Sequence, residues 1–167
     1  MTHYSTGKLQ ESGNFICRSG EIIPLGRGQD PWHPEFTYFR EVDFCSAASI
    51  IVRRELFEKV GGFDEFYAPA YFEDPDLALK FKKLGYKNYV MPLSKILHHE
   101  MASYGDTYDV GCARNRLRFC ERWEEFLSKA TYESWDDMRQ GYRFTKPRLL
   151  YIDAEYPQPD QIGRAHV

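Results

Sequence analysis

The strongest constraint on the fold is the stretch at residues 71–77, which reads Y-F-E-D-P-D-L. Aspartate is a favoured N-cap and proline suits the first helical position, so we expect Asp74 to cap a helix that begins at Pro75. Apolar residues then recur at helical spacing until Gly85, where we expect the helix to end. These apolar residues are Leu77, Phe81 and Leu84. The stretch therefore predicts an amphipathic helix with several carboxylates at its N-terminus.

A carboxylate at the start of a helix can serve either the fold or the chemistry. The helix dipole and the free N–H groups of the first turn favour the ionised form of Asp74, which suits a general base or a group that binds a hydroxyl. The same residues also fit an ordinary capped helix, because aspartate is common at N-caps. This stretch alone leaves both interpretations open.

The composition limits the class of protein. A chain of 167 residues, 43% of them hydrophobic, is long enough for one domain with a core. The aromatic content of 16% favours surfaces that bind sugars or other rings, although a plain aromatic core explains it as well. The net charge of −3 gives no nucleic-acid footprint, and we find no membrane-spanning run and no signal peptide. The four cysteines form no C-x-x-C pair, so we expect reduced core thiols.

The pattern along the chain predicts alternating short strands and helices. We expect a hairpin at 15–23, a long surface loop at 24–39, an extended segment at 41–52, a short helix at 54–60, strands at 86–91 and 95–98, a helix in the later part of 106–127, and a helix or linker at 132–142. Gly61 and Gly62 should stop the short helix. Such a pattern is typical of an α/β domain.

Two further groups of residues admit a functional and a structural interpretation. The small residues Ser46, Ala47 and Ala48 would let another group approach the backbone, but tight sheet packing explains them equally well. His98 and His99 have metal-ligand chemistry, yet neighbours on a strand point to opposite faces, so at most one is expected to be a ligand. A hydrogen-bonded histidine is the alternative.

Five motifs together resemble the C-terminal, acceptor-side half of a family 2 glycosyltransferase with the GT-A fold. They are R-E-V-D-F-C-S-A-A at 40–48, R-R-E-L-F at 53–57, G-G-F-D-E at 61–65, P-A-Y-F-E-D-P-D-L at 69–77, and His98. The likeness covers about residues 8–127, and such enzymes are found in bacterial gene clusters for polysaccharides and cell-surface glycans. It implies an incomplete Rossmann-like α/β domain, with a small mixed sheet flanked by helices and without the N-terminal nucleotide-binding half.

The resemblance implies roles on the acceptor side. Asp74 corresponds to the proposed catalytic base, which deprotonates the acceptor hydroxyl. Glu73 is then either a residue that supports the site residues from behind or a contact of the acceptor hydroxyl, rather than the base. Asp64 and Glu65 belong to the turn that lines the acceptor side, and Tyr71 lies in an aromatic run that would stack on a sugar ring.

The resemblance also implies donor and metal contacts. Ser46, Ala47 and Ala48 correspond to the small-residue strand beside the donor sugar, although the family more often has glycine where this chain has Ala47. Trp32, in the aromatic loop, is a further candidate for sugar stacking. His98 matches a histidine that helps to hold a divalent metal in some members, so Mn or Mg is expected in the full-length enzyme.

The resemblance divides the chain into four parts. We expect the acceptor half at 1–130, a linker at 131–147, the truncated start of a second glycosyltransferase module at 148–161, and a non-native tail at 162–167. The D-x-D segment of the donor half is not found before Gly7, so we expect the isolated chain to be inactive.

The expected partners follow from the same resemblance. They are a nucleotide-sugar donor and a glycan or lipid-linked acceptor, with no nucleic acid. The expected location is the cytoplasm, where association with the inner face of the membrane would be peripheral. Two alternatives are a non-catalytic carbohydrate-binding module and a structural fragment without activity. Asp74 separates the first of these from a transferase, because binding alone needs no base.

Overall fold

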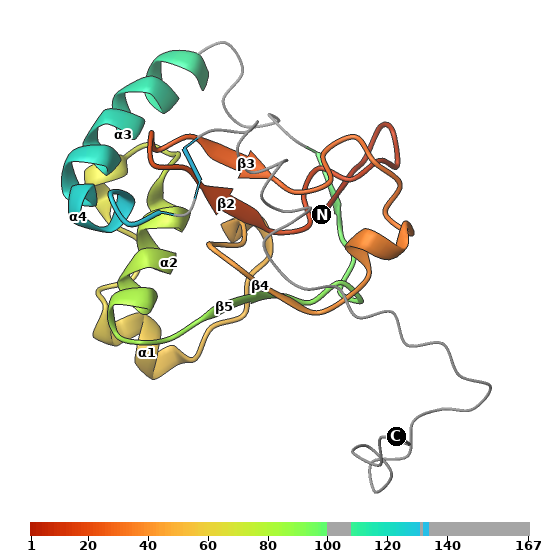
Figure 1. The fold of residues 1–167 in the computed structure, drawn as a ribbon, viewed down its shortest axis with the longest axis horizontal. Helices are drawn as coiled ribbons and strands as arrows, with labels where there is room; N and C mark the ends of the chain where they lie inside the picture. The colour runs from red at the N-terminus through yellow and green to blue at the C-terminus, as the bar shows by residue number, and fades with distance from the viewer. Residues whose placement is uncertain (100–107, 131, 134–167) are drawn as a thin grey trace, which may run out of the picture.

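The structure is a computed structural model that describes residues 1–99, 108–130 and 132–133. Within these residues the chain forms three two-stranded sheets and four α-helices, joined by long loops and three 3-10 turns (Figure 1). The strands are β1 (Thr2–His3), β2 (Asn14–Ile16), β3 (Ile22–Pro24), β4 (Arg40–Val42), β5 (Asn88–Val90) and β6 (Leu97–His98). The α-helices are α1 (Arg54–Lys59), α2 (Glu73–Lys83), α3 (Tyr108–Arg122) and α4 (Glu124–Leu127). The 3-10 turns are η1 (Pro34–Phe36), η2 (Ala47–Ser49) and η3 (Glu65–Tyr67).

The strands pair in both directions. β1 and β6 are parallel, whereas β2 pairs with β3 and β4 pairs with β5 in antiparallel register. The predicted α/β class is therefore confirmed, but in place of one small mixed sheet the described residues form three separate two-stranded sheets. The GT-A arrangement stays a prediction.

The hairpin and the short helix follow the sequence pattern closely. β2 and β3 enclose the turn at Gly20, where φ is +73°. α1 ends before Gly61 and Gly62, which both have positive φ, the conformation that glycine adopts without steric cost. The predicted loop at 24–39 is also present, interrupted by the single turn η1.

The extended segment predicted at 41–52 is much shorter in the structure. The strand ends at Val42, because the Ser46 side chain accepts a hydrogen bond from the Ala48 N–H at 3.3 Å and starts η2. The strands predicted at 86–91 and 95–98 are likewise reduced to β5 and β6. The predicted helix within 106–127 is present as α3 and α4.

The start of α2 differs from the prediction. The helix begins at Glu73, and Phe72 is its N-cap with φ at 75°, so the expectation that Asp74 caps the helix was wrong. The Asp74 carboxylate bonds to another segment instead. Pro75 becomes the third helical residue, where no N–H partner is yet required. The helix ends as predicted, before Gly85 at φ +84°.

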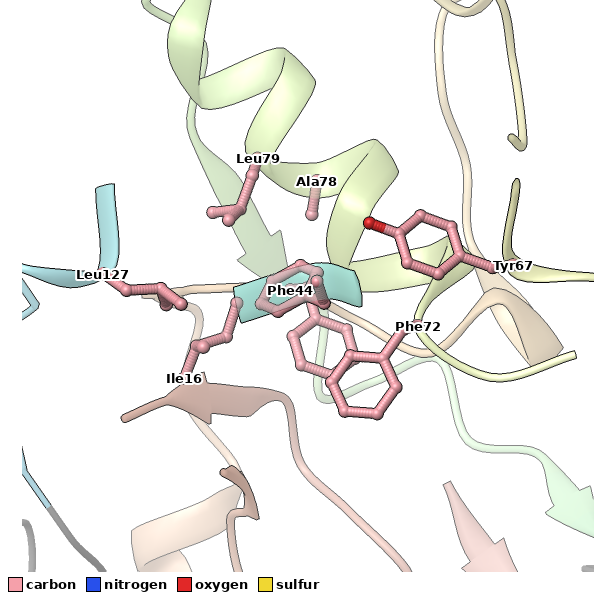
Figure 2. Packing of buried hydrophobic residues seen from close by; sticks show 8 residues of the cluster. Ile16, Phe44, Tyr67, Phe72, Ala78, Leu79 and Leu127 are labelled. Atoms are coloured by element: carbon pink, nitrogen blue, oxygen red, sulfur yellow. The ribbon is translucent and has the colours of Figure 1, made fainter. Parts of the chain in front are cut away.

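The core lies between the helices α2, α3 and α4 and the hairpin. Figure 2 shows side chains from β2, α2, α4 and the connecting segments meeting in one cluster. Burying each of the larger apolar side chains contributes about 1.5–3 kcal/mol. The cluster consists of Ile16, Phe44, Tyr67, Phe72, Ala78, Leu79, Phe119 and Leu127. Phe72 and Phe44 thus anchor both segments that carry the candidate site.

Other sequence expectations are tested only in part. The four cysteines are free thiols, as expected, although only Cys17 is fully buried. In the described ranges no helix has the length and apolar character needed to cross a membrane. The expected domain parts at 148–161 and 162–167 lie outside the described residues, as do most of the linker at 131–147 and of the segment at 132–142.

Replacing Gly13 with alanine should destabilise the hairpin strongly. Gly13 has φ +83°, and an added Cβ would lie 2.5 Å from Val42 Cγ1. A left-handed alanine costs about 1–2 kcal/mol and overpacking about 1–3 kcal/mol, so we expect a loss of about 2–5 kcal/mol in urea unfolding. Gly28→Ala is the control, since Gly28 has φ +79° and open space around it. An equal loss in both variants would contradict the predicted clash with Val42.

Candidate active site

The candidate site forms where α2 meets the segment between β4 and η2. Tyr71 and Phe72 have φ values of 74° and 75°, which are rare for residues other than glycine. The two residues turn the chain sharply, so that Glu73 and Asp74 become the first two residues of α2. The carboxylates at 73–74 are thus presented by a helix N-terminus whose entry is held in an unusual conformation.

Asp74 bonds to the small-residue segment. Its Oδ2 accepts a hydrogen bond from the backbone N–H of Ala47 at 3.3 Å, across 27 residues of sequence. Burial, reinforced by the neighbouring charge of Glu73, raises the pKa of Asp74 to about 7. The structure therefore brings together two of the sequence-predicted site segments, and the carboxyl group titrates near neutral pH.

Glu11 is a member of this site that the sequence did not reveal. Its Oε1 accepts a hydrogen bond from the Ser46 N–H at 3.2 Å, and its Oε2 accepts one from Asn14 Nδ2 at 2.9 Å. Two consecutive backbone N–H groups, of Ser46 and Ala47, are thus each bound by a carboxylate from a different segment. Glu11 lies in a polar N-terminal stretch without a motif, so only its position in the fold identifies it.

Glu73 carries a buried carboxylate oxygen that needs a partner. Burial raises its pKa, and backbone N–H groups of Glu73 and Tyr71 oppose this shift. Within the described residues, Glu73 Oε2 is buried and has no hydrogen-bond partner. A buried acceptor without a partner is costly, so this oxygen is a favourable place for a donor such as a hydroxyl group.

Cys45 lies beside the same segment but is not an activated thiol. Burial and the negative charge of Glu11 raise its pKa to about 11, and Sγ lies 3.5 Å from the carbonyl oxygen of Tyr89. A thiol with a raised pKa stays protonated at neutral pH and is a poor nucleophile. The carboxylates are therefore the reactive groups of the candidate site.

Asp64 forms ion pairs with side chains of α2 and α3. Its Oδ1 accepts from the Phe66 N–H at 2.9 Å, and its Oδ2 lies 2.7 Å from Arg122 Nη1. The Phe66 N–H and Arg122 together lower the pKa of Asp64 to about 2. Glu65 is exposed at the start of η3. The G-G-F-D-E turn is thus anchored to α3 through Asp64, and contact with an acceptor stays a prediction for both residues.

Asp76 is the second residue whose importance the sequence did not show. It is fully buried and accepts hydrogen bonds from Trp123 Nε1 at 2.8 Å and from the Tyr67 hydroxyl at 3.1 Å. In Figure 2 the Tyr67 hydroxyl points toward α2, the helix that carries Asp76. Lys80 Nζ lies 2.9 Å from the other carboxylate oxygen. Asp76, the last acidic residue of the 71–77 stretch, therefore stabilises the fold.

Trp32 and His98 each interact with a side chain outside the 71–77 stretch. The Trp32 ring is 71% exposed and carries Lys95 Nζ over its face at 2.9 Å from the centroid. His98 Nδ1 lies 2.8 Å from Gln10 Oε1, so this ring nitrogen is occupied. In the part of the chain that the structure describes, no three His, Cys, Asp or Glu side chains gather to hold a metal ion. These residues do not by themselves form a metal site, and the expected Mn or Mg stays a prediction.

The chain is similar to segments of proteins whose names describe sugar transfer or O-antigen biosynthesis. It is 41% identical over 66 residues to an N-acetylglucosaminyl-diphospho-decaprenol L-rhamnosyltransferase of Mycobacterium tuberculosis. The aligned region covers 40% of this chain and 21% of the relative. It is 30% identical over 139 residues to the O-antigen biosynthesis protein RfbC of Myxococcus xanthus, covering 79% of this chain and 10% of the relative. It is 39% identical over 69 residues to a galactofuranosyl glycosyltransferase of Leishmania donovani, covering 41% of this chain and 15% of the relative.

The match covers only a small part of each relative. The chain spans between 10% and 21% of the length of these three proteins. No family model matches the chain, and no solved structure matches it.

Proposed function

Because the chain is similar to glycosyltransferases, we propose that it forms the acceptor-side part of an inverting family 2 enzyme. Such an enzyme transfers a sugar from a nucleotide-sugar donor to an acceptor hydroxyl during the synthesis of a surface glycan. The observation that carries the proposal is the Asp74 carboxyl group, which is bound to the Ala47 N–H and has a pKa of about 7. A general base works best when its pKa lies near the working pH.

The proposed reaction needs one proton acceptor. The acceptor oxygen forms a bond to the anomeric carbon while the bond from that carbon to the nucleoside diphosphate oxygen breaks. The Asp74 carboxylate takes the hydroxyl proton, and the bonding electrons leave with the diphosphate. The sugar arrives with inverted configuration because the hydroxyl attacks from the face opposite the leaving group.

Glu73 supports this assignment as the group that orients the acceptor. Its buried Oε2 lacks a partner among the described residues and can accept a hydrogen bond from a second hydroxyl of the acceptor. In this proposal Asp74 and Glu73, the first two residues of α2, contact different hydroxyls of the acceptor. Tyr71, one residue before the cap, would border the same acceptor in this proposal.

The acceptor class follows from one of the relatives. The name of the mycobacterial rhamnosyltransferase describes an acceptor sugar joined through diphosphate to decaprenol. We extend this class to the present chain and propose a glycan or a lipid-linked sugar as acceptor, used at the inner face of a membrane. Lys95 lies over one face of the exposed Trp32 ring, and in this proposal the opposite face offers a flat apolar surface for a sugar of that acceptor.

A transfer assay tests the proposal. The protein that carries this chain is incubated with a panel of nucleoside diphosphate sugars, including those of L-rhamnose and galactofuranose, and with an N-acetylglucosaminyl-diphospho-lipid. We expect release of nucleoside diphosphate that depends on the acceptor, and a product whose anomeric configuration by NMR is opposite to that of the donor. A product with retained configuration would contradict the inverting mechanism. Sugar binding without transfer would favour the carbohydrate-binding module.

The rate of transfer should depend on pH with an acidic limb near pH 7. The base must be ionised, and burial together with Glu73 raises the pKa of Asp74 to about 7; Glu11 and Cys45 also face the group. We expect kcat/KM to fall by about 100-fold from pH 8 to pH 5, because the ionised fraction falls about tenfold per pH unit below the pKa. An acidic limb near pH 4 would show that Asp74 is an ordinary carboxylate or that another group is the base.

A further inference from the structure

Asn115 is a buried polar residue on α3 with an unusual set of partners. Its side chain is 0% exposed, and its Nδ2 lies within hydrogen-bond distance of three carbonyl oxygens. These oxygens belong to Tyr67 at 2.6 Å, Ala70 at 2.8 Å and Tyr71 at 3.0 Å. Burying an amide is costly unless it is hydrogen-bonded, so the site that Asn115 occupies is built for an amide.

Two arginines on the same helix extend this pattern. Arg114 Nη2 donates to the Ala68 carbonyl oxygen at 2.5 Å, and Arg118 Nη1 donates to the Phe66 carbonyl oxygen at 2.7 Å. Arg114 Nε also donates to Asn115 Oδ1 at 3.1 Å, which fixes the orientation of the amide. We call Arg114, Asn115 and Arg118 the α3 clamp. Between residues 66 and 71, five carbonyl oxygens accept hydrogen bonds from it.

The segment held by the clamp leads directly into the candidate active site. It ends at Tyr71, the first of the two residues with positive φ, and Glu73 and Asp74 follow after Phe72. A residue other than glycine in the left-handed region costs about 1–2 kcal/mol, so this entry persists only if other contacts hold it. Asn115 supplies such contacts at both ends of the segment, at Tyr67 and at Tyr71.

We propose that Asn115 is a positioning residue of the transfer reaction. Its amide fixes the path of the backbone through residues 67–71 and thereby the place where the Asp74 and Glu73 carboxylates meet the acceptor. This inference rests on the proposed function, because it assigns Asn115 a role through Asp74. Asn115 itself does not touch Asp74; it holds the backbone that precedes it.

The test compares Asn115→Ala with a matched asparagine. Asn88 Nδ2 also binds two carbonyl oxygens, of Asp43 at 2.8 Å and of Ala78 at 3.3 Å, but these lie away from the entry to α2. Asn115→Ala should lower kcat by 10-fold or more and leave the donor KM within about threefold, because small misplacements of a catalytic group reduce the rate strongly. Asn88→Ala should lose stability in urea unfolding and keep its kcat. Asn115→Ser keeps one hydrogen-bond donor, so its kcat should lie between the values of Asn115→Ala and of the unchanged protein. If Asn115→Ala does not fold, Asn115→Ser takes its place in the test.

A second measurement separates this inference from the proposed function. The chemical shift of the Asp74 carboxyl carbon is followed by NMR as pH is varied, in the protein that carries this chain. This measurement does not require that the protein transfers sugar. We expect the titration midpoint to move in Asn115→Ala and to stay in place in Asn88→Ala. An unchanged midpoint in Asn115→Ala, or equal losses of kcat in Asn115→Ala and Asn88→Ala, would overturn the positioning role. If Asp74→Asn still transfers sugar, Asp74 is not the base and the proposed function fails. The NMR titration of Asp74 in Asn115→Ala then still tests whether Asn115 positions this carboxyl group.

Discussion

Replacing Asp74 with asparagine is expected to lower kcat for sugar transfer by about 10²–10⁴-fold while donor affinity changes little. The amide has nearly the shape of the carboxyl group and can still accept the hydrogen bond from the Ala47 N–H. It cannot take the proton of the acceptor hydroxyl. The measurement is the rate of nucleoside diphosphate release, together with a separate titration of donor binding.

The same substitution should make the folded protein more stable at alkaline pH. Asp74 has a pKa of about 7 in the folded state against an ordinary value of 3.8, because burial disfavours the charge. Between these values the folded state holds a proton that the unfolded state has lost, so the stability contributed by this group falls as pH rises from 4 to 7. Above pH 7 the ionised carboxylate costs up to about 4 kcal/mol, which asparagine removes. Thermal unfolding at pH 8 and pH 4 should show a gain mainly at pH 8.

Asp64→Asn is the matched control, because its pKa is shifted in the opposite direction. Phe66 N–H and Arg122 lower the pKa of Asp64 to about 2, so its charge stabilises the folded state above pH 4. Asp64→Asn should therefore be less stable at pH 8. A loss of stability in Asp74→Asn at pH 8 would mean that Asp74 serves the fold. Intact turnover in Asp74→Asn would rule out the proposed base.

Replacing Asp76 with alanine is expected to destabilise the protein by about 3–5 kcal/mol, the largest loss of stability that we predict. The change leaves the Tyr67 hydroxyl and Trp123 Nε1 without their acceptor. It also leaves Lys80 and Arg122 without a carboxylate that lies 2.9 Å and 3.3 Å away. Lys80 and Arg122 keep Asp64 as a partner, but the Tyr67 and Trp123 donors lose their acceptor, which costs more than the net value of the hydrogen bonds. Urea unfolding followed by tryptophan fluorescence measures the loss.

Glu125→Ala provides the comparison for Asp76→Ala. Glu125 pairs with Lys129 one helical turn later at 2.7 Å, and both side chains are exposed. The substitution removes one negative charge, as Asp76→Ala does, but leaves no buried group unpaired, so we expect little change in the urea midpoint. Similar losses in the two variants would show that net charge, rather than the buried network, determines the effect.

The sequence predicted where the hairpin turns and where α1 and α2 end, because glycines at these positions determine the backbone conformation locally. Gly20 marks the hairpin, Gly61 and Gly62 end α1, and Gly85 ends α2, because each glycine adopts a positive φ at little cost. The apolar spacing of α2 appears in part in the structure, since Leu77 and Phe81 are buried but Leu84 is exposed. These parts need no knowledge of distant contacts.

Distant contacts determined the parts that the sequence did not predict. The start of α2 moved from Pro75 to Glu73 and its N-cap from Asp74 to Phe72, because Tyr71 and Phe72 adopt positive φ, and donors on α3 help to hold that conformation. Glu11 was missed because its partner, the Ser46 N–H, lies 35 residues later. The base role of Asp74 and the metal role of His98 stay predictions, since both depend on the substrates.

The α3 clamp also orders the assembly of the site in time. Asn115 lies 44 to 48 residues after the carbonyl groups that it binds. At a synthesis rate of about 5–20 residues per second, the loop at 66–71 emerges roughly 2–10 seconds before its donors do. During that interval water is the partner of these carbonyl groups, and the carboxylates at 73–74 have no fixed direction. If the inference about Asn115 holds, the entry to α2 takes its final path when α3 docks, so the carboxylates at 73–74 are oriented late in the synthesis of the chain.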